Sequence, residues 1–312
     1  MDKFLIETAK NKPKYYTLEF DKHLTARILD GLVAAACLQS NVKRAASQLR
    51  SEGINPCLAT VLVGDDPSSA LYVRNKHKAA AAAGILTRDH KLPSSCTQKE
   101  LLELIGTLNR DTEVHGILIQ LPLPTQINEF LVLSILNPVK DVDGLTPYNA
   151  GMLVCGKAIL KPCTPAGIVE LLGFNKVDIS GMDSVIVNRS TLVGKPLAFL
   201  LLERDATVTL CHSKTKMLVD KLKTADVLIT AVGNREHFLL TADMIKPHAV
   251  VIDVGISRYD GKLAGDVDFE NVKEKASWIT PVPGGVGPMT ISMLLKNTIT
   301  AASLKKEMNN RR

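Results

Sequence analysis

The sequence predicts an α/β protein of two domains: an N-terminal α/β catalytic domain and a Rossmann-like, doubly wound nucleotide-binding domain. Short apolar runs alternate with helical patterns along most of the chain, which is typical of parallel sheets. In the second half these runs end in glycine or polar residues, as in doubly wound sheets that bind a ligand at their strand C-termini. The 312 residues suffice for two domains, at roughly 100–200 residues each.

The first half of the chain carries the elements of one sheet with its helices. The apolar run 57–63 leads into Asp66, which suits a helix N-cap, and Pro67, which suits the first helical position. That helix is expected to stop at Gly84. Residues 1–24 show no clear apolar period and are interpreted as a tail. The expected elements are a helix at 24–50, a strand at 57–63, helices at 67–83 and 97–109, a strand at 116–120 and a helix at 128–136.

The motif Pro162-Cys163-Thr164-Pro165 punctuates the middle of the chain and opens a helix at 166–172. We therefore expect a domain boundary near 150–162. The predicted domains are 25–155 and 156–287, with 288–312 forming a helix that returns to the first domain. Beyond the boundary we expect strands at 184–187, 207–211, 227–231, 248–254 and 278–280, and helices at 195–204, 216–223 and 290–305.

Composition excludes several classes of function. No apolar run reaches the roughly 18 residues of a membrane span. The six cysteines are scattered without CxxC or metal-ligand spacing, so we expect reduced thiols in a cytosolic protein and no metal site. The net charge of +6 is dispersed and only 4% of residues are aromatic, which argues against nucleic-acid binding. The charge favours anionic small ligands.

The run 281–290 is the most informative stretch, because it holds three glycines and three prolines in ten residues. Proline fixes φ and glycine permits positive φ, so such a run specifies one backbone path. A backbone that must lie close to a ligand would have this composition. A rigid turn between domains would have it too, and the run alone does not decide between them.

A strand-to-helix turn at 188–196 contains Gly194 and Pro196, and its backbone N–H groups could hold a phosphate. It is not a GxGxxG sequence and is weak evidence alone. The next strand ends in residues 211–215 without the acid that binds the ribose 2′-hydroxyl in NAD-binding folds. A 2′-phosphate site or a solvated basic loop would both fit. The side chains that could converge on such a phosphate are Arg189, His212, Ser213 and Lys214.

The first half also carries candidate polar residues. Tyr72 and Lys76 stand four apart on one helix face, although such pairs usually lie on a surface. Gln120 ends a buried strand, where it could simply cap the sheet edge. Asp143 and its neighbour Asp141 supply two carboxylates, which could form a turn or helix cap. A metal would require more oxygen ligands than this loop offers.

Together these stretches resemble the bifunctional methylenetetrahydrofolate dehydrogenase/methenyltetrahydrofolate cyclohydrolase family. The motifs occur in family order across most of the chain, and the Gly/Pro run and LysAspValAspGly are highly specific. The matching stretches are 71–76, 116–124, 140–144, 162–165, 189–196, 253–256, 265–267 and 281–290.

The resemblance implies roles for residues of the first domain. Lys76 would be the cyclohydrolase catalyst and Gln120 would hold and tune it. Tyr72 would stack on the folate, and Asp143 would bind the pterin. The segment between the domains would border folate and nicotinamide through Pro283, Gly284, Gly287, Pro288 and Thr290.

The resemblance also implies NADP as cofactor, with Arg189 and Ser213 at its 2′-phosphate, and a cytoplasmic homodimer. The chain departs from the family pattern at Asn188, where glycine is usual; we expect its side chain to crowd the phosphates. The alternatives are a cyclohydrolase with a weakened dehydrogenase, or a non-catalytic folate- or dinucleotide-binding protein, which would have no use for Lys76. The residues implied to line the nucleotide cleft are Ser190, Gly194, Gly233, Gly255 and Ile256.

Overall fold

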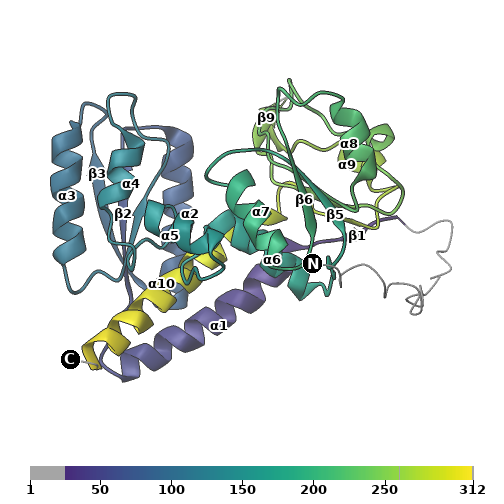
Figure 1. The fold of residues 1–312 in the computed structure, drawn as a ribbon. Coiled ribbons are helices and arrows are strands. Elements are labelled where there is room, and N and C mark those ends of the chain that lie inside the picture. The colour runs from purple at the N-terminus through teal and green to yellow at the C-terminus, as the bar shows by residue number, and fades with distance from the viewer. Residues whose placement is uncertain (1–24, 260, 311–312) are drawn as a thin grey trace, which may run out of the picture.

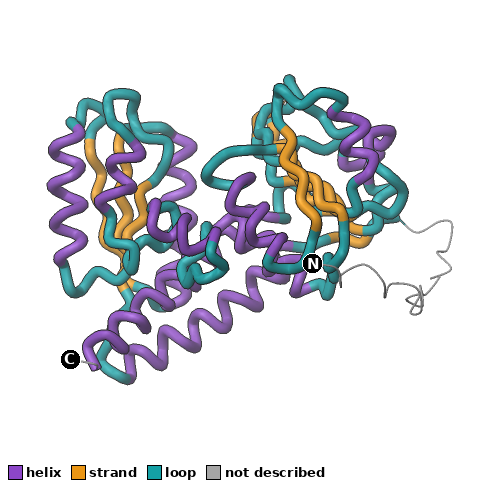
Figure 2. Tube along the Cα trace, viewed as in Figure 1, coloured by secondary structure: helices purple, strands orange, loops and turns teal. Residues whose placement is uncertain are grey.

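The computed structural model describes residues 25–259 and 261–310, without the side chains of 67–72 and 307–310. The tail expected at 1–24 lies outside the described residues. Figure 1 shows two lobes, one around β2 and β3 and the other around β5 and β6, with α1 and α10 running below them. Figure 2 shows the strands gathered in two separate groups flanked by helices. The structure therefore has the two-domain α/β architecture that the sequence predicts.

The first sheet has three parallel strands in the order β3-β2-β4. The central strand is buried along its whole length, as its apolar sequence requires. The edge strand β3 was not predicted, because its sequence LTRDHKL is charged and mostly exposed and contains no apolar run. The elements of this lobe are β2 (Cys57–Val63), α2 (Pro67–Ala83), β3 (Leu86–Leu92), α3 (Gln98–Arg110), β4 (Gly116–Ile119), α4 (Glu129–Ile135) and α5 (Pro147–Val154).

The predicted start of the first helix at Leu24 is wrong. Helix α1 (Gly31–Ser51) begins after Asp30, whose carboxylate accepts hydrogen bonds from the backbone N–H groups of Leu32 and Val33. The residues before this N-cap form a short strand, β1 (Arg27–Ile28), that pairs with the last strand of the other lobe. An acceptor side chain at Asp30 thus ends the strand and starts the helix.

The second sheet has six parallel strands in the order β1-β11-β8-β7-β5-β6. Chain order reverses at β5, which pairs with β6 on one side and β7 on the other; this is the topological switch point of a doubly wound sheet. The elements of this lobe are α6 (Cys163–Phe174), β5 (Asp183–Val187), α7 (Gly194–Leu202), β6 (Thr207–Cys211), α8 (Leu218–Thr224), β7 (Val227–Thr230), η1 (Ala242–Met244), β8 (Val250–Asp253), β9 (Ser257–Tyr259), β10 (Lys262–Ala264), α9 (Phe269–Val272) and β11 (Trp278–Ile279).

The last helix, α10 (Val286–Asn310), starts inside the Gly/Pro run, four residues earlier than predicted. It packs along α6 and α1 and reaches α2 and β4, so it returns to the first domain. Close approach is possible because Gly167 on α6 has no side chain: a Cβ there would lie 3.0 Å from Cβ of Met289. Within the described part of the chain, no helix is both long and apolar enough to cross a membrane.

Candidate active site

Lys76 and Gln120 meet at the C-terminal edge of the first sheet. Lys76 lies on α2 and its Nζ donates to Oε1 of Gln120 at 3.0 Å. The backbone N–H of Gln120 donates to the carbonyl of Val61 on β2, and its Nε2 donates to the carbonyl of Leu121. The first bond anchors the backbone of Gln120, and the second orients its side-chain amide so that the oxygen faces the lysine. Both side chains are half-buried, which leaves the pair open to a ligand.

Asp143 lies within electrostatic range of this pair. Burial raises the pKa of its carboxyl, while the charge of Lys76 and a hydrogen bond with the Cys163 thiol oppose that rise. Burial and the nearby Asp143 together hold the pKa of Cys163 well above its usual range, so this thiol is a hydrogen-bonding group and not a thiolate. The structure thus brings a lysine, an amide and a carboxylate to one place.

The loop that carries Asp143 is fixed by buried polar groups. Asp141, 1% exposed, accepts hydrogen bonds from the backbone N–H of Thr146 at 2.7 Å and from Nδ2 of Asn149 at 2.8 Å. Asn297 on α10 donates from Nδ2 to the carbonyls of Val142 and Lys161. The two carboxylates therefore differ: Asp141 supports the loop, whereas Asp143 remains partly exposed.

Tyr72, the fourth residue predicted for this site, lies on α2, four residues before Lys76. Its side chain is outside the described part of the chain.

At the C-terminal edge of the second sheet, the turn after β5 is closed by side chains. Oδ1 of Asn188 accepts from the backbone N–H groups of Ser190 at 2.7 Å and Gly194 at 2.9 Å. Oγ of Ser190 accepts from the N–H of Val193 at 3.0 Å. A Cβ on Gly194 would lie 2.4 Å from the carbonyl oxygen of Asn188, so only glycine permits this packing.

The predicted phosphate-binding side chains follow two neighbouring strand ends. Val187 pairs with Cys211, and Arg189 and Ser213 each stand two residues beyond that pair. Both residues are exposed. The segment after β6 is shaped by Thr215, whose Oγ1 accepts from the N–H of His212 at 2.8 Å. The structure therefore places Arg189 and Ser213 on adjacent loops at the same sheet edge.

Two buried aspartates, not predicted as site residues, hold the loops that follow β7 and β8 by hydrogen bonds to backbone N–H groups. Asp253 accepts from the backbone N–H groups of Gly255, Asp266 and Val267, each at 3.0 Å. Asp266 accepts from the N–H of Gly233 at 2.9 Å and from that of the preceding valine at 2.6 Å. Burial raises the pKa of Asp253 to about 6 and also raises that of Asp266.

Two glycines allow the backbone of these loops to lie against the aspartate side chains. Gly233 has φ +66°, and a Cβ on Gly255 would lie 2.2 Å from the carboxyl carbon of Asp266. Ile256, the remaining predicted cleft residue, is 41% exposed beside them. Two features of the sequence mark this arrangement. Asp253 ends an apolar strand two residues before Gly255, and Asp266 directly follows Gly265.

The Gly/Pro segment forms a tight loop between the two lobes. Gly284 has φ +107°, and the N–H of Gly285 donates to the carbonyl of Pro281 at 2.9 Å. Oγ1 of Thr290, on the first turns of α10, lies 3.0 Å from Oγ1 of Thr164 at the start of α6. The predicted residues of this segment differ in exposure: Pro283 and Gly287 are exposed, whereas Gly284, Pro288 and Thr290 are half-buried.

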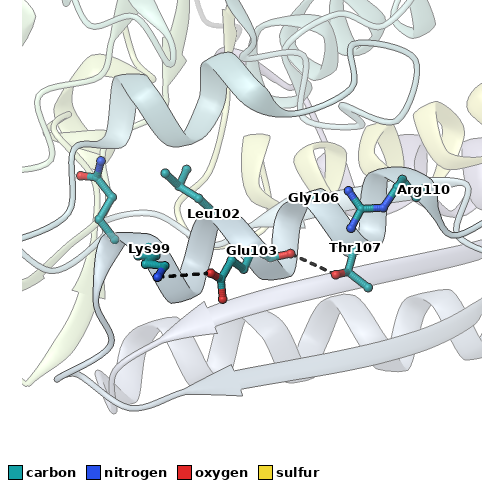
Figure 3. A pocket seen from close by; sticks show the side chains of 7 residues that line it. Lys99, Leu102, Glu103, Gly106, Thr107 and Arg110 are labelled. Atoms are coloured by element: carbon teal, nitrogen blue, oxygen red, sulfur yellow. Dashed lines mark hydrogen bonds and ion pairs between the residues drawn. The ribbon is translucent and has the colours of Figure 1, made fainter.

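A hollow of about 680 Å³ lies along α3 and is shown in Figure 3. Its labelled side chains come from one helix, with Lys99 and Glu103 paired at 4.0 Å. It contains none of the predicted site residues, and its lining has no group of the kind assembled around Lys76. We therefore assign it no part in the site. Nor do the described residues contain a group of three histidine, cysteine or acidic side chains placed to hold a metal.

Two family models match this chain. The tetrahydrofolate dehydrogenase/cyclohydrolase catalytic-domain model matches residues 29–143, and the NAD(P)-binding-domain model of the same family matches residues 162–306. The chain belongs to the tetrahydrofolate dehydrogenase/cyclohydrolase family.

Relatives of this family match over nearly their whole length. The bifunctional protein FolD of Nitrosopumilus maritimus is 56% identical over 285 residues, covering 91% of this chain and 99% of the relative. The crystal structure of FolD from Campylobacter jejuni aligns with a TM-score of 0.87 at 47% identity, covering 89% of this chain and 99% of that one. FolD from Trypanosoma brucei, solved with NADP and an inhibitor, aligns at 0.85 and 38% identity over 90% and 98% of the two chains.

The family match separates the candidate residues into the two parts seen in the structure. Tyr72, Lys76, Gln120 and Asp143 fall within the match to the tetrahydrofolate dehydrogenase/cyclohydrolase catalytic domain. Residues from Arg189 to Thr290 fall within the match to its NAD(P)-binding domain. The hydrolytic candidates and the nucleotide candidates thus lie on different sheets, joined by the Gly/Pro segment and α10.

Proposed function

We propose that this chain oxidises 5,10-methylenetetrahydrofolate to the methenyl form with NADP and hydrolyses the product to 10-formyltetrahydrofolate. The observation that carries the proposal is the hydrogen bond from Lys76 Nζ to Gln120 Oε1 beside Asp143. A protein that only binds folate or a dinucleotide has no need of a lysine held in this way.

The hydrolytic step needs a proton acceptor, because water loses a proton as it attacks the methenyl cation. The substrate is itself cationic, and a nearby cation favours the neutral form of an amine. We assign this task to Lys76, whose Nζ is oriented by Gln120. Asp143 can accept from the 2-amino and ring N–H groups of the pterin, since one carboxylate matches such a donor pair. Tyr72 is assigned to stacking on the folate.

The redox step transfers no proton, so positioning carries much of its catalysis. When bound, NADP supplies the acceptor for a hydride from the N–CH2–N bridge. The residues present fit this cofactor: a turn packed around Gly194 stands at the switch point, and no acid lies in residues 211–215. We assign the 2′-phosphate to Arg189 and Ser213, and the cleft lining to the loops at Ser190, Gly233 and Gly255 with Ile256.

We assign the Gly/Pro segment to the border between folate and nicotinamide. Glycines allow its backbone to lie near both ligands, and its tight loop is held by the bond from Gly285 to Pro281. The residues proposed to contribute are Pro283, Gly284, Gly287, Pro288 and Thr290.

The proposal extends to a cytoplasmic homodimer. Strand β6 ends the second sheet and most of its residues are exposed, including Leu210 at 38%. Such an edge offers unpaired backbone groups to a second copy. Sedimentation at micromolar concentration would report a single species of twice the chain mass if this is right, and a monomer if it is wrong.

The decisive experiment is to compare Lys76→Ala with Lys78→Ala, an exposed lysine on the same helix. Purified protein is assayed for NADP reduction with methylenetetrahydrofolate and, separately, for decay of methenyltetrahydrofolate. We expect Lys76→Ala to abolish hydrolysis while retaining measurable NADP reduction, and Lys78→Ala to retain both. Equal loss of both activities in Lys76→Ala, with folate still bound, would contradict the assignment.

A further inference from the structure

Asn188 stands directly after β5, at the point where strand order reverses. Besides accepting from Ser190 and Gly194, its side chain donates from Nδ2 to the carbonyl of Ala231 at 2.6 Å. Ala231 directly follows β7, the neighbour of β5 on the other side of the switch point. One half-buried amide therefore joins the loops that follow two neighbouring strands at the switch point.

This arrangement does not require glycine at position 188. Asn188 is not among the described residues with positive φ, so its backbone gains nothing from the freedom of glycine. Its side chain lies on its own turn and on the β7 loop. The expectation that it crowds the phosphates treats it as an obstruction, whereas these contacts show it as part of the turn.

The contacts predict what a glycine would remove. The N–H groups of Ser190 and Gly194 would lose their side-chain acceptor, and the carbonyl of Ala231 would lose this donor. The backbone at 188 would also gain conformational freedom. The turn at the start of α7 would then have to be ordered when a ligand binds, which weakens binding.

We propose that Asn188 is a positioning residue for NADP: its amide holds the turn 188–194 and the loop after β7 in the arrangement that receives the dinucleotide. The inference rests on the proposed function, because it takes NADP as the ligand at this edge of the sheet. It makes Asn188 a determinant of cofactor affinity.

The test is calorimetric titration of the full-length protein with NADP, and separately with a folate substrate, for wild type and Asn188→Gly. We expect Asn188→Gly to weaken NADP binding at least tenfold more than folate binding. Asn271→Gly, an exposed asparagine of the same sheet domain, is the matched control and should change neither affinity. Asn188→Ala makes the same comparison should the glycine variant not fold.

A second measurement needs no cofactor. In the unliganded protein, amide hydrogen exchange at Ser190 and Gly194 should be slow in wild type and at least tenfold faster in Asn188→Gly, since both N–H groups lose their acceptor. Unchanged or tighter NADP binding by Asn188→Gly would overturn the inference and restore the crowding interpretation. Absence of NADP binding by the wild-type protein would instead overturn the proposed function, and this inference with it.

Discussion

At the scale of single residues, the two carboxylates of the 140–144 loop are expected to behave differently. Asp143→Asn removes a charge-assisted acceptor, so we expect folate affinity to fall by about 1.5–3 kcal/mol, roughly 10- to 150-fold. NADP affinity should hardly change. Asp141→Asn should instead lower the free energy of unfolding, because Asp141 is buried and supports the loop. Calorimetry and urea denaturation of both variants check this; unaltered folate affinity in Asp143→Asn would contradict the pterin assignment.

Arg189 is the residue on which cofactor choice is expected to depend. A guanidinium can bind a phosphate bidentately, so Arg189→Ala should cost about 1.5–3 kcal/mol of NADP binding and much less of NAD binding. The quantity to measure is kcat/KM for NADP over that for NAD. Arg204, exposed beyond the end of α7, provides the control substitution to alanine. A wild-type ratio at or below one, or a ratio that Arg189→Ala leaves unmoved, would refute the assignment.

Sequence alone could suggest which residue types carry the chemistry but not every contact that holds them. Lys76, Gln120 and Asp143 could be selected because they lie in specific motifs, and the structure brings all three together. The bond from Asn188 to Ala231 could not be predicted, since it joins loops that follow different strands. The neighbours of Asn188 in the sequence lead instead to the expectation that its side chain crowds the phosphates.

At the scale of elements, the start of α1 is fixed by its packing on the Gly/Pro segment. A Cβ on Gly31 would lie 1.7 Å from the carbonyl oxygen of Gly285, so the backbone would have to move. We expect Gly31→Ala to lower the free energy of unfolding by about 1–3 kcal/mol, as overpacking does. Gly151→Ala on α5, with open space around the added Cβ, should be neutral or stabilising. Denaturation curves of equal midpoint for Gly31→Ala and wild type would contradict this.

The elements that the sequence predicted share an apolar run or a clear helix signal. Helix α3 starts at a capping box of Thr97 and Glu100, close to its predicted start. Strand β3 has neither signal, because it lies at a sheet edge and carries charged residues on both faces. Strand β1 is two residues long and exists only because β11 lies beside it, which no local pattern reveals.

At the scale of the whole molecule, His115 is expected to contribute acid sensitivity. It is 6% exposed, and burial, with the nearby Lys305 and Lys140, lowers its pKa to about 4. The folded pKa lies below the usual 6.5, so its contribution to stability is present above about pH 6.5 and lost as pH falls toward 4. The loss amounts to about 3 kcal/mol.

Replacing this group should change the pH profile of unfolding. Relative to wild type, His115→Gln should gain stability as pH falls from 7 to 4, measured by urea denaturation at several pH values. Asp253 has the opposite sign: its raised folded pKa of about 6 makes its contribution decline as pH rises from about 4 to 6. The difference between variant and wild type therefore isolates His115. A difference independent of pH would contradict the expected loss.

The pairing of β1 with β11 has a consequence for synthesis of the chain. Strand β1 (Arg27–Ile28) leaves the ribosome long before its partner β11 (Trp278–Ile279). The second sheet thus cannot be completed until β11 has been synthesised, and α10, which packs on elements of both lobes, follows it. If the chain were divided between the lobes and the halves were expressed separately, the second half would lack β1 and the first would lack α10. Neither half alone would therefore contain all the elements of its own lobe.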